Sequence, residues 1–292
     1  MKHLYKELSE DCWELILNQL AIDDFNHLQS PSLVCKLFLS ITDRLRLKLN
    51  VPNRLFYSHN CEGLFRALQR FTNLQEIELR DPIFGDKADV NYPIQRITSS
   101  EKILIYDDSG LSFHGLSNFL CGCPSLTHLT LCFNNFLTDN YMRDLCRYLP
   151  NLVSIKFNRC SNITTATFFI LAKECPMLSK IGLPNIKPQV EDDFNLELKR
   201  NYRIRSLDLT CSVYLNDEFI KKVGAVCPNL QTLNLNGLLS LIIEGIGEIL
   251  RCCSQIKHLI VDRTRDMVIF LKQFKTRRIK NGHGYNLEGL YD

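Results

Sequence analysis

The hydrophobic pattern L-x-x-L-x-L returns every 26 residues along most of this chain, and its register is never lost. Only one of the pattern positions, Ser100, is polar. A fixed period of this length is typical of a solenoid, because one small strand-and-helix unit can bury its apolar face only against its neighbours. The chain therefore predicts an extended concave binding surface rather than an enclosed pocket. The copies start at Leu74, Ser100, Leu126, Leu152, Leu178, Ile204, Leu230 and Ile256.

Residues 123–148 show how one repeat is built. Leu129 and Leu131 alternate with polar residues, which predicts a strand with one buried face. Thr138 then follows a turn signal and predicts the N-cap of a helix, as Thr164 and Asn216 do in other repeats. The sequence thus predicts an α/β solenoid of about eight repeats. Internal prolines indicate loop rather than helix on the outer side of two of them, residues 71–96 and 175–200.

Composition and charge exclude several classes of protein. The chain has 292 residues, of which 45% are hydrophobic and 23% charged, as in an ordinary soluble protein. The net charge of +3 is too small to indicate nucleic acid as the main partner. No apolar run is long enough to span a bilayer, and residues 1–7 lead into acids rather than into a signal peptide. We expect a protein of the cytoplasm and/or nucleus, without a membrane partner.

The thirteen cysteines do not indicate a metal site or a disulfide framework. Their number is odd, and no C-x-x-C occurs. Four of them, Cys123, Cys175, Cys227 and Cys253, each stand three residues before a copy of the pattern. We interpret them as reduced cysteines that fill one small apolar slot in successive repeats, and we expect no cofactor.

Residues 1–50 do not follow the repeat. Residues 8–20 predict a helix capped by Ser9, with acids in its first turn. A second helical pattern runs from Ser32 to about Leu45, with Pro31 just before it. Both are more apolar than so small a unit can hide internally. The segment is therefore either a cap for the solenoid or a helical motif that docks a partner.

These N-terminal residues resemble an F-box, in which L-P-x-x-x-x-x-x-I/L-x-x-x-L precedes S-x-V-C-K/R-x-F/W-x-x-I. One departure is Ser9, which stands where the family usually has proline. The first half is carried by Leu8, Leu15 or Ile16, and Leu20, and the second by Ser32, Val34, Cys35, Lys36, Phe38 and Ile41.

The periodic part, from residue 71 to about 275, resembles the leucine-rich repeat family and its cysteine-containing subclass, of a plant-like type. That subclass has a cysteine eight residues after the first leucine. Cys160 keeps this place, whereas Asn134, Ser212 and Leu238 occupy it elsewhere. The resemblance implies residues 1–50 as F-box, 51–70 as a linker or capping segment, 71–276 as leucine-rich repeats and 277–292 as a tail.

The combination resembles the F-box/leucine-rich-repeat proteins. It implies a non-catalytic, substrate-recognition subunit of an SCF-type cullin–RING ubiquitin ligase. The F-box would dock on a Skp-type adaptor, and through it on the cullin, while the repeats bind an unknown protein substrate. Candidate adaptor-binding residues are Leu8, Trp13, Ile16, Leu20, Leu33, Val34, Lys36 and Phe38.

The substrate face follows from strand alternation, because residues between the buried pattern positions point to the opposite side. Aromatic and basic residues gather in its middle, which favours a target of acidic character. Candidate substrate-binding residues are Tyr106, His128, Phe133, Lys156, Arg159, Lys180, Asp208 and His258.

Other functions stay open. One is a leucine-rich-repeat scaffold or inhibitor without a ligase link, and another is a hormone-type receptor assisted by a small molecule or an inositol phosphate. An enzyme is disfavoured, since G-x-S-x-G, H-E-x-x-H and P-loop motifs are absent. At the C-terminus we expect a last helix over residues 265–276. The basic stretch from Lys272 to Lys280 is either a nuclear-import signal or a solvated end, and the tail offers little to cover the final strand.

Overall fold

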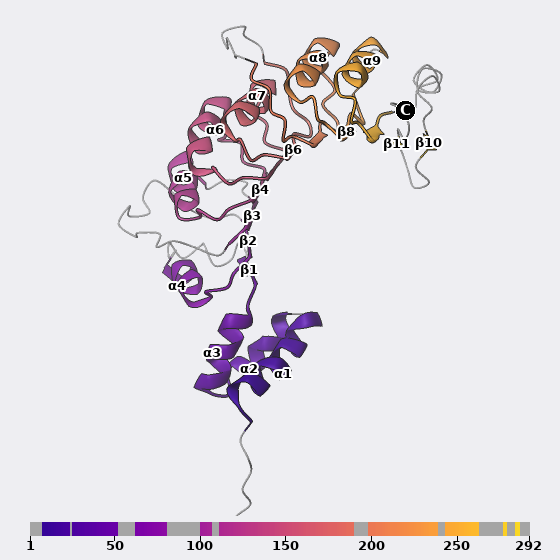
Figure 1. Cartoon of the computed structure of the whole chain (residues 1–292). Coiled ribbons are helices and arrows are strands. Elements are labelled where there is room, and N and C mark those ends of the chain that lie inside the picture. Colours follow the sequence, from indigo (N-terminus) through magenta and orange to yellow (C-terminus); the bar gives the residue numbers. More distant parts are fainter. Residues whose placement is uncertain are drawn as a thin grey trace, which may run out of the picture.

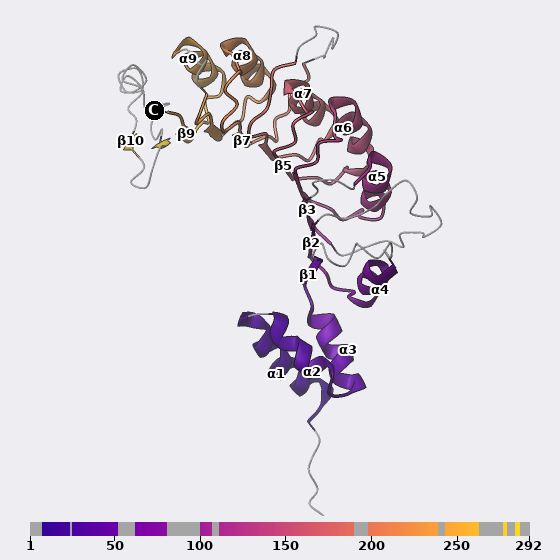
Figure 2. The same ribbon diagram turned by 180° about the vertical axis from the view of Figure 1, so that it is seen from behind.

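The computed structural model describes residues 8–23, 25–51, 62–80, 100–106, 111–189, 198–238, 243–262, 277–278 and 284–286. These residues form an arc with strands along its inner side and helices along its outer side (Figures 1 and 2). A group of helices, α1 to α3, lies beyond one end of the arc. Two short strands, β10 and β11, lie at the other end.

The inner side is one sheet in which β1 to β9 are parallel and follow chain order. From β2 to β9, each pairing joins residues 26 positions apart, as Leu129 pairs with Ile155. The period of the sequence is therefore the register of the sheet. The strands are β1 Lys48–Val51, β2 Glu76–Arg80, β3 Lys102–Tyr106, β4 His128–Cys132, β5 Ser154–Asn158, β6 Lys180–Gly182, β7 Ser206–Asp208, β8 Thr232–Asn234 and β9 His258–Ile260.

Every position of the L-x-x-L-x-L pattern is buried, as predicted. Burial of each leucine or isoleucine stabilises the fold by about 1.5–3 kcal/mol. The one polar member, Ser100, is fully buried, and its hydroxyl donates to the carbonyl of Leu74 at 3.2 Å. A polar side chain is tolerated there because its hydrogen bond is made to the preceding rung.

Helices cover the outer side. The three predicted caps are confirmed: the side chains of Thr138, Thr164 and Asn216 each accept a hydrogen bond from a backbone N–H in the first turn of the helix that follows. Of the expected loops, residues 81–96 and 190–197 lie outside the described residues. Residues 183–189 and 198–200 are described and contain no helix, as expected. The helices are α4 Glu62–Arg70, α5 Phe113–Cys121, α6 Asp139–Leu145, α7 Thr165–Glu174, α8 Asp217–Val226 and α9 Ile243–Cys252.

A left-handed residue follows the strand in five successive repeats. Each has a positive φ and stands seven residues after the start of its pattern. The N–H groups of Phe133 and Cys211 donate to carbonyls of the next repeat at 2.8 and 2.7 Å, so this backbone turn extends the ladder between rungs. The five residues are Phe133 (φ 61°), Arg159 (54°), Asn185 (59°), Cys211 (59°) and Gly237 (79°).

The four cysteines that stand three residues before a copy of the pattern fill the small apolar slot predicted for them. All four are buried and free. Burial raises the pKa of Cys123 and of Cys253 to about 12. Asn201 takes the slot in another repeat, where its amide donates to the carbonyl of Ala172 at 3.0 Å. Within the described part of the chain no group of side chains has the makeup of a metal site.

The far end of the sheet is covered, contrary to the expectation from the tail. Strand β11, Gly284–Asn286, pairs antiparallel with β9, and β10, Arg277–Arg278, pairs with β11. The tail can add strands because the edge of β9 offers unpaired backbone groups. The helix expected over residues 265–276 lies outside the described residues.

The N-terminal module consists of α1 Glu10–Asp23, a 3₁₀ turn Phe25–Leu28, α2 Gln29–Ser32 and α3 Lys36–Leu45. Ser9 caps α1 as predicted, with its hydroxyl accepting from the N–H of Cys12 at 3.4 Å. The second helix expected from Ser32 is interrupted. Cys35 is extended and caps α3, its sulfur accepting from the N–H of Phe38, which leaves Leu33 and Val34 in a turn.

The sheet and the module meet where the sequence suggested a boundary at residue 50. Strand β1 spans that boundary, and α4 occupies part of the expected linker of residues 51–70. Each of the described helices is too short or too polar to cross a bilayer.

Candidate protein-interaction surfaces

The N-terminal module has a small core of its own. Its buried apolar residues are Leu17, Ala21, Leu28 and Ile41. Two candidates for adaptor binding, Trp13 and Phe38, pack against this core with ring centroids 4.8 Å apart. The structure therefore places these two half inside the module, where they hold α1 against α3.

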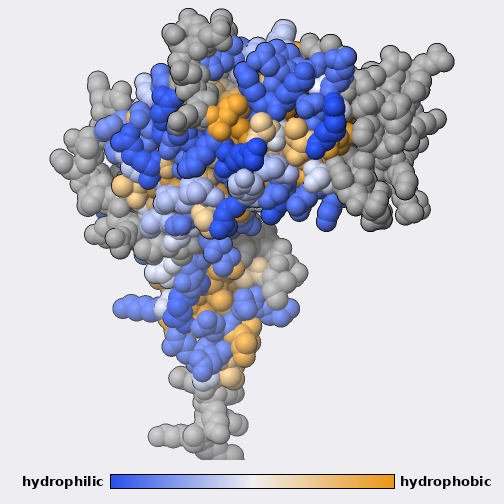
Figure 3. Space-filling view, turned by 45° about the horizontal axis from the view of Figure 1, so that its top comes forward, coloured by the Kyte–Doolittle hydropathy of each residue, from blue (hydrophilic) through white to orange (hydrophobic). Residues whose placement is uncertain are grey.

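The other adaptor candidates lie on the outside of the module. Leu33 and Val34 are the most exposed of them, at 86% and 68%, because the turn before α3 holds them away from the core. Figure 3 shows apolar patches on the module in its lower part. Leu15 and Leu37 are exposed too and were not among the candidates. We define the apolar surface of the module as Leu8, Leu15, Ile16, Leu20, Leu33, Val34 and Leu37, with Lys36 exposed beside it.

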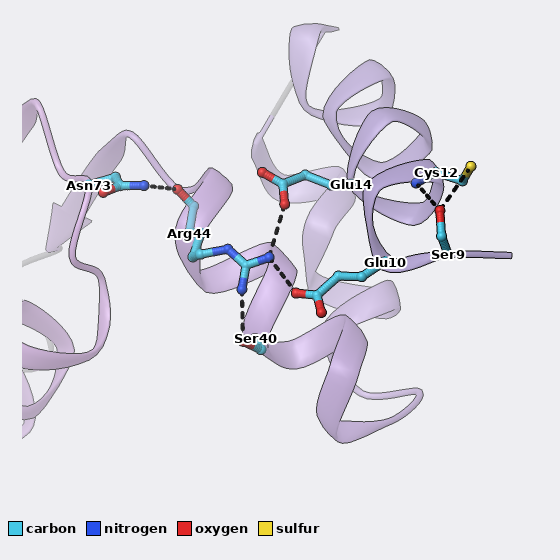
Figure 4. Close-up of polar contacts among 7 residues, drawn as sticks. All are labelled: Ser9, Glu10, Cys12, Glu14, Ser40, Arg44 and Asn73. Atoms are coloured by element: carbon cyan, nitrogen blue, oxygen red, sulfur yellow. Dashed lines mark hydrogen bonds and ion pairs between the residues drawn. The ribbon is translucent and has the colours of Figure 1, made fainter.

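Arg44 links the module internally and stands next to the first rungs of the solenoid. Its guanidinium donates to Glu10 at 2.8 Å, to Glu14 at 2.9 Å and to Ser40 at 3.2 Å, which ties α3 to α1 (Figure 4). The amide of Asn73 donates to the Arg44 carbonyl at 3.0 Å. A second tie pairs Arg70 of α4 with Asp43 at 2.6 Å. These contacts present the apolar surface in a defined position at the end of the arc.

The concave face brings six of the eight substrate candidates together. Tyr106, His128, Lys156 and Lys180 lie on β3 to β6, on outward positions of adjacent rungs. Phe133 and Arg159 follow β4 and β5 in the left-handed turns, and the Arg159 guanidinium lies 5.3 Å from the centroid of the Phe133 ring. The remaining two stand apart, Asp208 on β7 and His258 on β9.

The sheet register is the observation that decides the fold. Strand, turn and capped helix recur at the same offset, and the apolar positions of each rung stack on those of the next. The fold is a leucine-rich-repeat solenoid. Proteins with this fold present an extended concave surface to their protein partners.

Comparisons with known proteins find relatives that are similar to part of the chain. No protein-family model matches the chain. The chain is 26% identical over 159 residues, or 51% of its length, to the F-box/LRR-repeat protein 4 of Bos taurus. It is 29% identical over 123 residues, or 41% of its length, to the Antagonist of mitotic exit network protein 1 of Candida glabrata. The matched segment spans about a quarter (24%) of each relative.

Two solved structures are similar over about two thirds of the chain. In the Toll–Spatzle complex of Drosophila, the similar chain has a TM-score of 0.44 and 12% identity, and the match covers 69% of this chain and 25% of that one. In the TLR13–ssRNA13 complex, the corresponding values are 0.33, 13%, 68% and 38%. The fold assignment rests on the sheet register and not on these scores.

His128 is a titratable group on the concave face of the solenoid, at the start of β4. The Thr127 hydroxyl donates to the carbonyl of Glu101 at 3.0 Å and lies 2.8 Å from Nδ1 of His128. Because that hydroxyl has one proton, Nδ1 carries the hydrogen of this contact and the neutral ring keeps Nε2 as an acceptor. Burial lowers the pKa of His128, and the positive charges of Lys102 and Lys180 lower it further, while Glu101 raises it.

Proposed function

We propose that this chain is a substrate-recognition subunit of an SCF-type cullin–RING ubiquitin ligase. The N-terminal module acts as the F-box and docks on a Skp-type adaptor, while the leucine-rich repeats hold the target protein. The observation that carries the proposal is the apolar surface of the module, exposed beside a core of only a few residues.

The free energy gained by covering that apolar surface favours a permanent or frequent partner. Each leucine, isoleucine or valine that a partner covers contributes about 1.5–3 kcal/mol when fully buried. Several such residues on one small module exceed the scattered apolar exposure that is normal for a protein surface. Similarity to a protein named F-box/LRR-repeat protein 4 supports the same assignment.

In this proposal the chain makes and breaks no bonds. It increases the rate of ubiquitin transfer by proximity, because it holds a target lysine near the loaded conjugating enzyme that the cullin carries. The chain would act in the cytoplasm or the nucleus, where those components are found, and would need no cofactor.

The test is co-purification of the full chain with a purified Skp-type adaptor. Ile16→Glu and Leu33→Glu place a charge in the apolar surface and should each weaken adaptor binding by tenfold or more. Tyr214→Glu is the matched control, because Tyr214 is 68% exposed on the repeats, far from the module. It should bind the adaptor like the unaltered chain.

The structure of each variant is checked by circular dichroism, since the altered side chains are already exposed. Retained adaptor binding by both Ile16→Glu and Leu33→Glu would contradict the docking surface. Failure of the unaltered chain to bind any Skp-type adaptor would favour the scaffold or inhibitor without a ligase link.

A further inference from the structure

The concave face carries a group of basic side chains on and just after β3 to β6. We define the basic cluster as Lys102, His128, Lys156, Arg159 and Lys180. The residues of β3 to β6 that face the concave side include no aspartate or glutamate. The lysines and Arg159 form no ion pair with a side chain in the described ranges.

Basic residues nearer the module behave differently. Lys48 pairs with Glu76 at 2.7 Å, and Arg80 pairs with Glu78 at 2.7 Å. The acidic and basic side chains of β1 and β2 therefore neutralise one another. The positive potential of the concave face begins at β3 and ends at β6, because the next outward charge along the sheet is the acidic Asp208 of β7.

The sheet register sets the cluster in rows. Lys102 pairs in register with His128, His128 with Ser154, and Ser154 with Lys180. Three rung spacings of about 4.8 Å separate Lys102 from Lys180, which makes roughly 14 Å. An extended peptide that crosses the rungs advances about 3.3 Å per residue, so side chains about four residues apart would meet the two lysines.

Gly182 shapes the middle of this path. A Cβ at Gly182 would lie 3.0 Å from Cγ and 3.4 Å from Cβ of Lys156, so the stem of Lys156 rests on the glycine of the next rung. A larger residue there would displace Lys156 from its place between the two outer lysines. This contact gives the cluster one member with a defined position.

An aromatic edge lies beside the cations. Arg159 covers the Phe133 ring at 5.3 Å, and Arg80 covers the Tyr106 ring at 5.1 Å, so two arginine–aromatic pairs border the strand ends. Phe133 and Arg159 hold left-handed backbone conformations that bulky residues seldom adopt. The turn belongs to the repeat, and in these two repeats it sets an aromatic and a cationic side chain beside one another.

We propose that the basic cluster binds a negatively charged, extended peptide segment of the target protein. The segment crosses the rungs from β3 to β6, with acidic groups about four residues apart at Lys102 and Lys180 and another near Lys156. The proposal deepens the function given above, because it rests on the concave face being the target-binding side. It does not depend on the adaptor.

Protonation of His128 should strengthen this binding. Lys102 on β3, Lys180 on β6, and Glu101 and Thr127 next to the strands are the groups that face it. An anionic segment adds negative charge, which raises the pKa of His128 in the complex above its value in the free protein. For a segment whose acids are carboxylates, affinity should therefore rise as the pH falls from 7.5 to 5.5, above the range in which those carboxylates are protonated.

The experiment measures fluorescence anisotropy of labelled twelve-residue peptides bound to the full chain. One peptide has aspartates at positions 4 and 8, a second has phosphoserines there, and a third has asparagines. The first two should bind at least tenfold more tightly than the third, with affinity that falls as salt rises. The aspartate and phosphoserine arms tell which acid supplies the charge.

The double variant Lys102→Gln and Lys180→Gln should lower affinity for both acidic peptides by tenfold or more, and Gly182→Ala should lower it several-fold. Lys221→Gln is the matched control, because Lys221 is exposed on α8 at the outer side of the arc. With the aspartate peptide, His128→Gln should remove the dependence on pH and leave binding at pH 7.5 nearly unchanged.

Equal affinity for the three peptides would overturn the proposal, and so would equal losses with Lys221→Gln and with the double variant. Binding of inositol hexakisphosphate without binding of either acidic peptide would overturn it in favour of a small-molecule site. Loss of adaptor binding with intact peptide binding would sink the ligase assignment alone.

Discussion

The left-handed residues that follow β4 to β8 include non-glycine residues, which carry backbone strain. A non-glycine residue in this conformation costs roughly 1 kcal/mol or more. At Gly237 the cost is absent, and an added Cβ there would lie 3.0 Å from Cα of Cys211. At Arg159 the cost is retained together with a long cationic side chain.

Arg159→Gly should therefore separate stability from binding. The substitution removes about 1 kcal/mol of strain, partly offset by the greater freedom of glycine in the unfolded chain. We expect a free energy of unfolding in urea that is unchanged or raised by up to about 1 kcal/mol, together with weaker binding of the acidic peptides. Destabilisation by more than 1 kcal/mol would show that the Arg159 side chain is structural.

The cysteines provide a second test at this scale. Burial raises the pKa of Cys123 and of Cys253 to about 12, so their thiolates are scarce below pH 9. Iodoacetamide at pH 8 should modify the exposed cysteines first, and the two buried thiols only in denaturant, as peptide mass spectrometry can show. The exposed cysteines of the described part are Cys12, Cys35, Cys121, Cys211 and Cys252.

The same shift makes stability depend on pH. The pKa in the folded state is above the unfolded value of about 8.5, so the contribution of these thiols is complete below that pH and is lost as the pH rises toward 12. The free energy of unfolding should fall above about pH 9, and Cys123→Ala should make that fall smaller. An equally steep fall in Cys123→Ala would contradict this origin.

Residue by residue, periodicity predicted burial well and backbone conformation poorly. All positions of the apolar pattern are inside because alternation in a strand decides which face a side chain takes. The left-handed turn was not predicted, because glycine, its usual signal, stands at only one of the five places. Of the other four, Asn185 is of a type enriched at positive φ, whereas phenylalanine, arginine and cysteine give no sign of it.

At the scale of elements, one carboxylate joins two successive helices. Asp139, the first residue of α6, accepts from the N–H of Thr164 at 3.0 Å and from its hydroxyl at 2.8 Å, and it also accepts from the hydroxyl of Thr167. Thr164 is itself the N-cap of α7. The cap of one repeat is thus held by the helix of the preceding repeat.

Asp139→Ala should lower the free energy of unfolding by about 1–3 kcal/mol, because it leaves partly buried donors without an acceptor. Asp144→Ala on the same helix is the control. Asp144 pairs with Arg147 in an exposed i,i+3 contact, which is worth less than about 1 kcal/mol. Urea titrations of the two variants decide this, and equal losses would contradict the bridging role.

The start of a helix was predicted best where its N-cap is a residue type that commonly caps helices. Threonine and asparagine marked the starts of α6, α7 and α8 correctly. The start of α3 was missed because its cap is the sulfur of Cys35, a weak acceptor that the sequence does not mark. For the adaptor candidates this mattered, since the turn exposes Leu33 and Val34, whereas Trp13 and Phe38 close the small core.

At the scale of the whole molecule, there are two hydrophobic cores of very different size. One runs through the repeats from Leu49 to Val261. The other contains four buried residues of the N-terminal module. Since stability grows with buried apolar area, the module should open at a much lower free energy than the central repeats.

Leu17→Ala removes the largest buried side chain of α1 and should cost about 2–5 kcal/mol. We expect faster amide hydrogen exchange throughout α1 and α3, with unchanged protection in β4 to β6. Leu207→Ala, at a fully buried position on β7, should do the reverse and speed exchange in neighbouring rungs.

A Skp-type adaptor, if it docks on the apolar surface, should slow exchange in the module of the unaltered chain, because a ligand that binds only the folded form stabilises it. Equal loosening of β4 to β6 by Leu17→Ala would show that module and repeats unfold as one unit, and the module could not then be a separately stabilised docking element.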